Sequence, residues 1–242
     1  MRTKTYLITG GTAGIGFNLA QSLKLKGHRV IITGRDAQRV ATAAANLDCI
    51  GYVADSQNLN QISQLASDLS KDNISLDGLV LNAGVFHPKS FMQSTPEDFD
   101  TTINVNTKGP FFTLQALAPL MANPSSVVFI SSIVVHKAFE GCSVYSASKA
   151  AFEAVVRVAN LELASLNIRV NSVQPGVTAT EIQSKAGMSK DDQNAFFGTL
   201  QTTPLGRVLS AQDQVGAIEF LLSDGSIALR NAVIEVAGGQ TL

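Results

Sequence analysis

The chain has few charged residues and few cysteines. Only 15% of its 242 residues are Asp, Glu, Lys or Arg, against roughly 25% in an average soluble domain, while 45% are hydrophobic. This hydrophobic content excludes a disordered chain. The two cysteines, Cys49 and Cys142, lie far apart in the sequence. They indicate neither a disulfide framework nor cysteine ligands of a metal, and they suit the reducing cytoplasm.

Charges of one sign are not concentrated anywhere. Eighteen basic and nineteen acidic residues leave a formal charge of −1, and without a long basic stripe the sequence gives little support for nucleic-acid binding. The three histidines are widely separated, so no metal site is predicted. The apolar stretch near Met1 is too short for a signal peptide, and we expect a cytoplasmic protein.

One stretch, from Gly109 to His136, carries no Asp, Glu, Lys or Arg. It is long enough in principle to cross a bilayer. Asn123-Pro124-Ser125-Ser126 interrupts it, which favours a helix followed by a buried strand, and no membrane span is predicted.

Short apolar runs alternate with longer helical patterns along the whole chain. This alternation predicts one α/β domain over residues 1–242, with a doubly wound, seven-stranded parallel sheet of the Rossmann type and helices on both faces. The strands are expected at Thr5–Thr9, Arg29–Thr33, Ile50–Val53, Gly78–Leu81, Val127–Ser131, Arg169–Gln174 and Ala232–Val236. Helices are expected at about 14–26, 37–46, 57–71, 97–121, 145–165 and 211–223.

Several residues indicate where helices begin and end. Gly27 fits the position just after the first helix, and Asp55, Ser94 or Thr95, and Ser210 are candidate N-caps. The stretch 177–207 resists assignment because glycines and prolines are scattered through it. A loop this long is more often functional than accidental, so we predict a lid over a substrate.

A glycine-rich turn follows the first strand and opens a helix. Its residues are Gly10, Thr12, Ala13, Gly14, Ile15 and Gly16. Glycines let the backbone approach a pyrophosphate, whose charge the helix N-terminus favours, so the turn indicates a dinucleotide site. The alternative is simply a tight connection between a strand and a helix.

The spacing of these glycines, G-x-x-x-G-x-G, resembles that of the short-chain dehydrogenase/reductase family. Other motifs of the family follow in order: Asn82-Ala83-Gly84, Asn106, Ser132, Tyr145 with Lys149 as Y-x-x-x-K, Pro175-Gly176 and Thr180. The resemblance implies an NAD(P)-dependent oxidoreductase acting on CH–OH groups. It also implies cofactor contacts from these residues and from Val177 and Thr178.

The candidate catalytic residues are Ser132, Tyr145 and Lys149, supported by Asn106. Tyr145 and Lys149 are four apart, so they share one face of a helix. A nearby ammonium favours a phenolate, so we expect Lys149 to lower the pKa of Tyr145, which can then act as general acid or base. Ser132 can hold the substrate oxygen. Taken alone, the Tyr–Lys pair could also be an ordinary helix tyrosine with a solvated lysine.

Asn106 and the Asn82-Ala83-Gly84 segment are harder to interpret. The family resemblance implies that Asn106 holds a water that relays protons to Lys149, and that Asn82-Ala83-Gly84 packs beside the adenine ribose. From the residues alone, Asn106 is a polar interruption of an apolar helix. Helix-end chemistry near Gly109-Pro110 is the alternative explanation, and Asn82-Ala83-Gly84 could be an ordinary turn.

The choice of cofactor depends on the end of the second strand. NAD enzymes usually place an acid there, whereas this chain has Gly34 followed by Arg35. Arg35 can pair with a 2′-phosphate, so NADP(H) is favoured over NAD(H). Asp36 and Ala13 weaken this preference. Asp55 matches the acid that the family places near the adenine.

The sequence therefore predicts an enzyme that transfers a hydride between NADP(H) and a small carbonyl or secondary alcohol. Ser132, Tyr145, Val134, His136, Phe139 and Cys142 are the candidate substrate contacts. One alternative is a 3-oxoacyl-thioester (acyl-carrier-protein) reductase, although Leu166 and Asn167 lie where such enzymes commonly carry a basic residue. The other alternative is a non-catalytic dinucleotide-binding sensor.

Few charges occur in the second half of the helix at 97–121 or along one face of the helix at 145–165. In the family that the chain resembles, these two helices pack against a neighbouring subunit. We therefore expect a homo-oligomer, a tetramer or a dimer.

Overall fold

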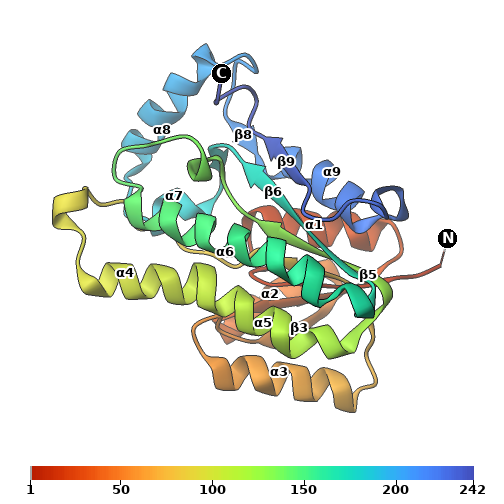
Figure 1. Ribbon diagram of the computed structural model, residues 1–242. Coiled ribbons are helices and arrows are strands. Elements are labelled where there is room, and N and C mark those ends of the chain that lie inside the picture. Colours follow the sequence, from red (N-terminus) through yellow and green to blue (C-terminus); the bar gives the residue numbers. More distant parts are fainter. Residues whose placement is uncertain (1) are drawn as a thin grey trace.

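The computed structural model describes residues 2–242 and contains the predicted seven-stranded parallel sheet (Figure 1). The strand order is β3-β2-β1-β4-β5-β6-β9, with every neighbouring pair parallel. The strands are β1 (Thr5–Ile8), β2 (Arg29–Gly34), β3 (Ile50–Val53), β4 (Leu76–Leu81), β5 (Met121–Ile130), β6 (Ile168–Pro175) and β9 (Val233–Val236). The order reverses direction between β1 and β4, which is where ligands bind in doubly wound sheets.

Helices cover both faces of the sheet and create two hydrophobic cores. On one face lie α1 (Gly14–Leu25), α2 (Ala37–Leu47) and α9 (Ala211–Leu222), packed on Ile8, Ile32 and Val128. On the other lie α3 (Leu59–Lys71), α5 (Gly109–Leu117) and α6 (Ser143–Glu162), packed on Leu7 and Phe129. Because both faces are buried, the central strands β1, β4 and β5 carry continuous apolar runs, whereas the edge strands β3 and β9 alternate in exposure.

Most of the predicted helix ends are confirmed. Gly27 has a φ of 78° directly after the end of α1. Thr95 caps α4 (Pro96–Ile103) and Ser210 caps α9, each in a reciprocal capping box. Asp55 is not an N-cap, which corrects that prediction. Asn58 caps α3 instead, because its side chain accepts hydrogen bonds from the backbone of the first turn.

The helix expected at 97–121 is one continuous rod with a change of winding. α4 passes into a π-helical segment, Asn104–Lys108, then into α5 and a short 3-10 turn at Ala118–Leu120. The chain enters β5 at Met121, earlier than the predicted Val127. The charge-free stretch from 109 to 136 is therefore divided between a helix and a strand. Within residues 2–242, no helix has both the length and the apolar character needed to cross a bilayer.

The segment 177–207 contains regular structure that its composition did not reveal. It forms β7 (Thr178–Ala179), α7 (Glu181–Lys185) and α8 (Lys190–Thr199). β7 pairs with β8 (Leu209–Ser210), so the two ends of the segment are held side by side. The helices are short and carry scattered apolar residues, so no helical periodicity could be recognised. The segment packs as a separate lobe near the carboxyl ends of the strands (Figure 1).

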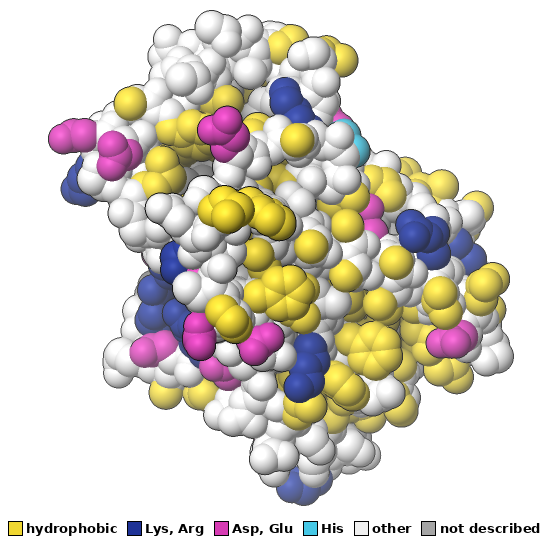
Figure 2. All heavy atoms as spheres, turned by 60° about the vertical axis from the view of Figure 1, so that its left-hand side comes forward, with side chains coloured by type: hydrophobic (Ala, Val, Ile, Leu, Met, Phe, Trp, Pro, Cys, Tyr) yellow, Lys and Arg dark blue, Asp and Glu magenta, His cyan; other side chains and the backbone are white. Residues whose placement is uncertain are grey.

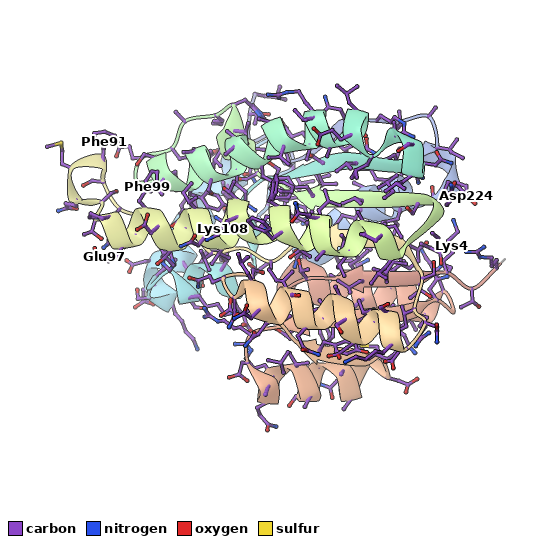
Figure 3. The ribbon with its side chains drawn as sticks, turned by 60° about the horizontal axis from the view of Figure 1, so that its bottom comes forward. Lys4, Phe91, Glu97, Phe99, Lys108 and Asp224 are labelled. Carbon is purple, nitrogen blue, oxygen red and sulfur yellow. The ribbon has the colours of Figure 1, made fainter. Side chains whose placement is uncertain are left out.

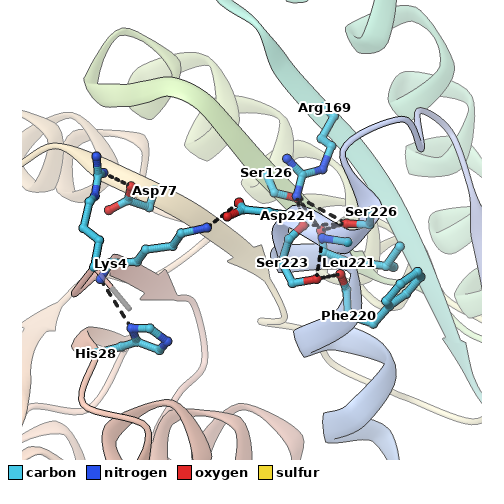
Figure 4. A network of polar contacts seen from close by, with 12 residues as sticks. Lys4, His28, Asp77, Ser126, Arg169, Phe220, Leu221, Ser223, Asp224 and Ser226 are labelled. Atoms are coloured by element: carbon cyan, nitrogen blue, oxygen red, sulfur yellow. Dashed lines mark hydrogen bonds and ion pairs between the residues drawn. The ribbon is translucent and has the colours of Figure 1, made fainter.

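Polar contacts link the elements at the other end of the sheet, where the parallel strands begin. Arg169, at the start of β6, donates to the carbonyl oxygens of Leu221 and Ser223 at the end of α9 (Figure 4). Lys4 forms an ion pair with Asp224 at 2.6 Å. The contacts of Arg169 satisfy carbonyl groups that the end of α9 leaves free. All of these contacts lie far from the candidate site.

Candidate active site

A cavity of about 740 Å³ lies at the carboxyl ends of β1, β2, β3, β4, β5 and β6. Segments that follow these six strands meet there, together with α7 and α8. Of the predicted site residues, all line it except Gly16, Asn106 and His136. Those that line it are Gly10, Thr12, Ala13, Gly14, Ile15, Gly34, Arg35, Asp55, Asn82, Ala83, Gly84, Ser132, Val134, Phe139, Cys142, Tyr145, Lys149, Pro175, Gly176, Val177, Thr178 and Thr180.

The glycine-rich turn has the shape of a phosphate cradle. Gly10 has a φ of 64°, and a Cβ at this position would lie only 3.0 Å from the Cα of Ala83. Ala13, the N-cap of α1, offers no side-chain acceptor to the helix N-terminus, and the first turn carries no acid. The free N–H groups of that turn therefore face the cavity, where a bound anion can accept from them. These residues fit the pyrophosphate of a dinucleotide.

The turn is fixed by the segment that follows β4. Asn82 donates through Nδ2 to the carbonyl oxygens of Thr9 and Gly10 at 2.9 and 3.1 Å. The backbone N–H of Ala83 donates to Thr9 Oγ1. Gly16 is buried where α1 packs against Asn82. Asn82 and Gly16 therefore hold the cradle in place, and Asn82 also lines it.

Ser132, Tyr145 and Lys149 meet at the middle of the cavity. Ser132 follows β5, while Tyr145 and Lys149 lie one turn apart on α6. The Ser132 hydroxyl lies beside the hydroxyl of Tyr145. Lys149 is 3% exposed and donates through Nζ to the Ile130 carbonyl oxygen at 2.7 Å. Its Nζ lies 5.8 Å from the centre of the Tyr145 ring.

The electrostatics differ from the sequence prediction at Tyr145. Burial raises the pKa of Tyr145 to about 12, although the neighbouring Ser132 hydroxyl opposes the rise. The rings of Phe86 and Tyr145 pack edge to face, with 5.1 Å between their centroids. Removal from water is therefore the largest influence on the pKa of Tyr145, and burial also lowers the pKa of Lys149 to about 8. In the chain by itself Tyr145 holds its proton firmly, and Lys149 keeps its charge at neutral pH.

Asn106 is fully buried behind the cavity, in the π-helical segment. Its Nδ2 donates to the Val85 carbonyl oxygen at 2.9 Å and to Ser148 Oγ at 3.0 Å, and its Oδ1 accepts from the Val85 N–H at 2.9 Å. Ser148 in turn donates to the Tyr145 carbonyl oxygen. The backbone stays helical through Gly109-Pro110, where the π-helical segment passes into α5, so the rod changes its winding there rather than ending. The Asn106 side chain joins the loop after β4 to the Tyr145 helix.

Near the end of β2, two acids, Asp36 and Asp55, each accept a hydrogen bond from a backbone N–H group. Asp36 caps α2 by accepting a hydrogen bond from the Arg39 N–H at 2.8 Å. Arg35, the charged residue directly after β2, lines the cavity. Asp55 accepts from the Gln57 N–H and lines the cavity as well. Arg39 also pairs with Glu181 of α7 across this end.

The remaining part of the cavity is mainly apolar. Beside the predicted Val134, Phe139 and Cys142, it contains residues that the sequence did not single out: Phe86, Pro88, Ile182, Met188 and Phe196. Phe86 and Pro88 could have been found, because they follow Asn82-Ala83-Gly84 at a strand's carboxyl end. His136 lies outside this cavity and pairs with Glu235 at 3.0 Å. Burial raises the pKa of the Cys142 thiol.

Metal chemistry finds no support in the arrangement of side chains. Across residues 2–242, no three His, Cys, Asp or Glu side chains are grouped so that they could hold a metal ion.

Comparisons with known proteins agree with this geometry. A family model described as "Enoyl-(Acyl carrier protein) reductase" matches residues 10–241. The human protein named "Dehydrogenase/reductase SDR family member 4" is 32% identical, over 99% of this chain and 88% of its own length. The "3-oxoacyl-[acyl-carrier-protein] reductase" of Rickettsia felis is 31% identical, over 99% of this chain and 97% of its own length.

A solved structure is similar over nearly the whole fold. A protein titled "short chain dehydrogenase/reductase family protein" superimposes with a TM-score of 0.86 and 33% identity, covering 98% of this chain and 96% of its own. The match extends from the glycine-rich turn to the last strand.

Proposed function

Because the chain belongs to the short-chain dehydrogenase/reductase family of NAD(P)-dependent oxidoreductases, we propose that it reduces an apolar ketone or aldehyde with NADPH as the hydride donor. One observation carries this proposal. Ser132, Tyr145 and Lys149 meet in a cavity whose one side is a phosphate cradle and whose other side is apolar.

The chain's own residues account for the proton and the orientation of the substrate. When bound, a nicotinamide dinucleotide supplies the hydride that adds to the carbonyl carbon. Ser132 Oγ donates a hydrogen bond to the substrate oxygen and holds it beside Tyr145. Tyr145 Oη then gives its proton to that oxygen as the C–H bond forms, so the carbonyl becomes an alcohol. The ammonium of Lys149 stabilises the phenolate that remains.

Tyr145 carries its proton at neutral pH, because its pKa is about 12. This is the protonation state in which it can donate to a carbonyl oxygen. Asn106 supports this step as a positioning residue, because its hydrogen bonds to Val85 and Ser148 link the loop after β4 to the Tyr145 helix. The proton relay that the family resemblance implies for Asn106 stays a prediction.

The preference for NADP(H) rests on Arg35. It is exposed at the end of β2 and lines the cavity. The neighbouring Asp36 would repel a 2′-phosphate, but its carboxylate is bonded to the first turn of α2. Arg35 can therefore form a charge-assisted pair with a 2′-phosphate. Asp55 completes this end as a polar neighbour of the adenosine.

The substrate is expected to be uncharged and to carry bulky apolar groups. Phe86, which packs against the Tyr145 ring, lines the cavity together with Val134, Met188 and Phe196. α7 and α8 provide part of this lining, which supports the proposal that segment 177–207 acts as a lid over the substrate. A second candidate, suggested by the Rickettsia relative's name, is the reduction of 3-oxoacyl thioesters.

A substrate panel with both cofactors tests the proposal. Purified protein is assayed for oxidation of NADPH and of NADH with aromatic and aliphatic ketones, a keto acid, a ketose and an acetoacetyl thioester. We expect the highest kcat/KM for an uncharged, bulky ketone with NADPH. Preferred turnover of the thioester would support the second candidate. Dinucleotide binding without turnover of any carbonyl would indicate a non-catalytic sensor.

We also propose that the protein is a homo-oligomer, with α5 and α6 at the interface. The outer face of α6 presents exposed apolar side chains at intervals of four and three residues, namely Ala147, Ala151, Ala154, Val158 and Leu161. Phe111 of α5 and Phe99 of α4 are also exposed, at 40% and 49%. Hydrophobic side chains are numerous on the surface seen in Figure 2, and Phe99 points outward from α4 in Figure 3.

Neighbouring exposed apolar side chains of this kind commonly mark a subunit interface. Light scattering at micromolar concentration should give the mass of a dimer or tetramer. Val158→Glu, which places a charge within the apolar stripe, should shift that mass toward the monomer. A wild-type protein that stays monomeric would contradict this part of the proposal.

The cysteines support a cytoplasmic location, which we propose. Cys49 and Cys142 are both free thiols in the structure. Free thiols persist in reducing compartments, whereas secreted proteins usually pair them.

A further inference from the structure

The last residues of the chain, Ala237–Leu242, contact three separate segments, and one of the residues contacted, Val177, lines the cavity. The Gly238 carbonyl oxygen accepts from the Leu205 N–H at 3.1 Å, which anchors the end of the lid segment. The Gln240 carbonyl oxygen accepts from Lys137 Nζ, in the loop after Ser132. The Gln240 side chain contacts Val177, in the turn after β6. We call residues 237–242 the C-terminal strap.

The contact between Gln240 and Val177 is a paired one. Gln240 Oε1 accepts from the Val177 N–H at 2.7 Å, and Gln240 Nε2 faces the Val177 carbonyl oxygen at 3.4 Å. A carboxamide offers an acceptor and a donor side by side, so it can satisfy both backbone groups of one residue. Gln240 is only 6% exposed. Gly176 permits the approach, because a Cβ there would lie 2.8 Å from Gln240 Oε1.

Two further glutamines hold the residue that follows. Gln183 Nε2 donates to the Thr178 carbonyl oxygen at 2.9 Å, and Gln214 Nε2 donates to Thr178 Oγ1 at 3.1 Å. All three glutamine side chains are buried. The segment from Gly176 to Thr178 therefore lines the cavity and is held by three glutamine carboxamides, of which those of Gln214 and Gln240 lie outside the cavity lining.

This segment lies at the end of the cavity where hydride transfer must occur. It follows β6, the neighbour of β5, whose end carries Ser132. The phosphate cradle and Arg35 follow β1 and β2, farther along the strand order. Gln240 itself does not line the cavity. It can act on a bound dinucleotide only through the backbone of Val177.

We propose that Gln240 is a positioning residue, which fixes the Val177 backbone as the wall against which the nicotinamide half of the cofactor is seated. The proposal rests on the proposed function, since it assumes a dinucleotide in the cavity. It makes the C-terminal strap part of the active-site architecture. The adenosine half, held by residues after β1 and β2, does not depend on Gln240.

The test compares two ligands that differ in the nicotinamide half. Binding of NADPH and of 2′,5′-ADP is measured by calorimetry for the wild type and for Gln240→Met, which keeps the side-chain length. Losing one buried hydrogen-bonded pair should raise the Kd of NADPH about tenfold. The Kd of 2′,5′-ADP should stay within about twofold of the wild type, because no contact of that half is removed.

The chain offers a matched control in Asn160. Its carboxamide pairs in the same way with the N–H and carbonyl oxygen of Val170, in the middle of β6 and away from the cavity. Asn160→Leu should lower Tm as Gln240→Met does and leave both Kd values unchanged. This separates a loss of stability from a loss of positioning.

Two results would overturn the proposal. One is an unchanged Kd of NADPH in Gln240→Met, and the other is equal weakening of NADPH and 2′,5′-ADP. If Gln240→Met does not fold, Gln240→Glu keeps the acceptor for the Val177 N–H, and the ratio of the two Kd values must still rise. A wild type that binds NADPH no more tightly than 2′,5′-ADP would contradict this proposal, whereas absence of any carbonyl turnover contradicts only the proposed function.

Discussion

Replacing Lys149 by Met should stabilise the protein while abolishing its activity. Lys149 is buried, and no carboxylate forms an ion pair with it in the part of the chain that the structure describes. Burial lowers the pKa of its ammonium from 10.5 to about 8. That difference corresponds to about 3 kcal/mol of stability lost while the buried amine is charged.

The net effect at neutral pH follows from two opposing contributions. Met fills a similar volume and removes the cost of the buried charge. It also removes the hydrogen bond to the Ile130 carbonyl oxygen, which costs about 1 kcal/mol. The variant should therefore be about 2 kcal/mol more stable at pH 7, which raises Tm by roughly 4–8 °C in a chain of this size.

The sign of the pH dependence distinguishes this explanation from better packing. The pKa of Lys149 is lower in the folded protein than in the unfolded chain, so between about pH 8 and 10.5 the folded state loses its proton first. Wild-type stability should therefore rise over this range, and Lys149→Met should lack the rise. Urea unfolding at equal protein concentrations, at pH 7 and about pH 10, measures both values. At about pH 10 the advantage of the variant should disappear.

A variant that is less stable than the wild type at pH 7 would refute this reasoning. An advantage that is the same at both pH values would also refute it, because packing does not titrate. Reductase activity should fall by at least about a hundredfold, since Lys149 no longer stabilises the phenolate of Tyr145. Lys149 would then lower the stability of the folded protein while being required for its activity, a combination that is common at active sites.

Two further substitutions test other parts of the site. Asn106→Ala removes the three hydrogen bonds that join Val85 to Ser148, so kcat should fall at least about tenfold in steady-state assays, while the Kd of NADPH measured by calorimetry changes little. A large rise in that Kd would show that Asn106 acts on cofactor binding instead. Arg35→Ala removes a charge-assisted pair, so the KM for NADPH should rise by roughly tenfold or more while the KM for NADH is unchanged. Equal changes in the two KM values would remove the basis for NADP(H) preference.

The sheet and the glycine-rich turn could be predicted because their signals are local. Continuous apolar runs such as Val127–Ser131 mark buried parallel strands. Gly27 follows the end of α1 because it has no side chain, and Thr95 begins α4 because its side chain caps the first turn. The prediction that Asp55 is an N-cap is wrong because Asn58, three residues later, can make the same capping hydrogen bonds. The position at which the backbone turns into α3 determines which of the two side chains caps the helix.

The features that were missed depend on contacts between distant segments. Asn106 is held by Val85 and Ser148, which lie 21 and 42 residues away. The raised pKa of Tyr145 comes from burial beneath Phe86, which no spacing within the Y-x-x-x-K motif reveals. α7 and α8 are short, and their packing rather than their periodicity defines them. The hydrogen bonds between Gln240 and Val177 likewise cannot be predicted from the sequence, because the two residues are far apart in the chain and meet only in the folded structure.

The central claim is that Tyr145 supplies the proton in an NADPH-dependent reduction. The most direct measurement is the oxidation rate of NADPH by the wild type and by Tyr145→Phe, with the best ketone of the panel, alongside calorimetric binding of NADPH to both proteins. Removing only the hydroxyl should lower kcat by about a hundredfold or more while the Kd of NADPH stays within about twofold. Turnover by Tyr145→Phe at the wild-type rate would contradict the mechanism.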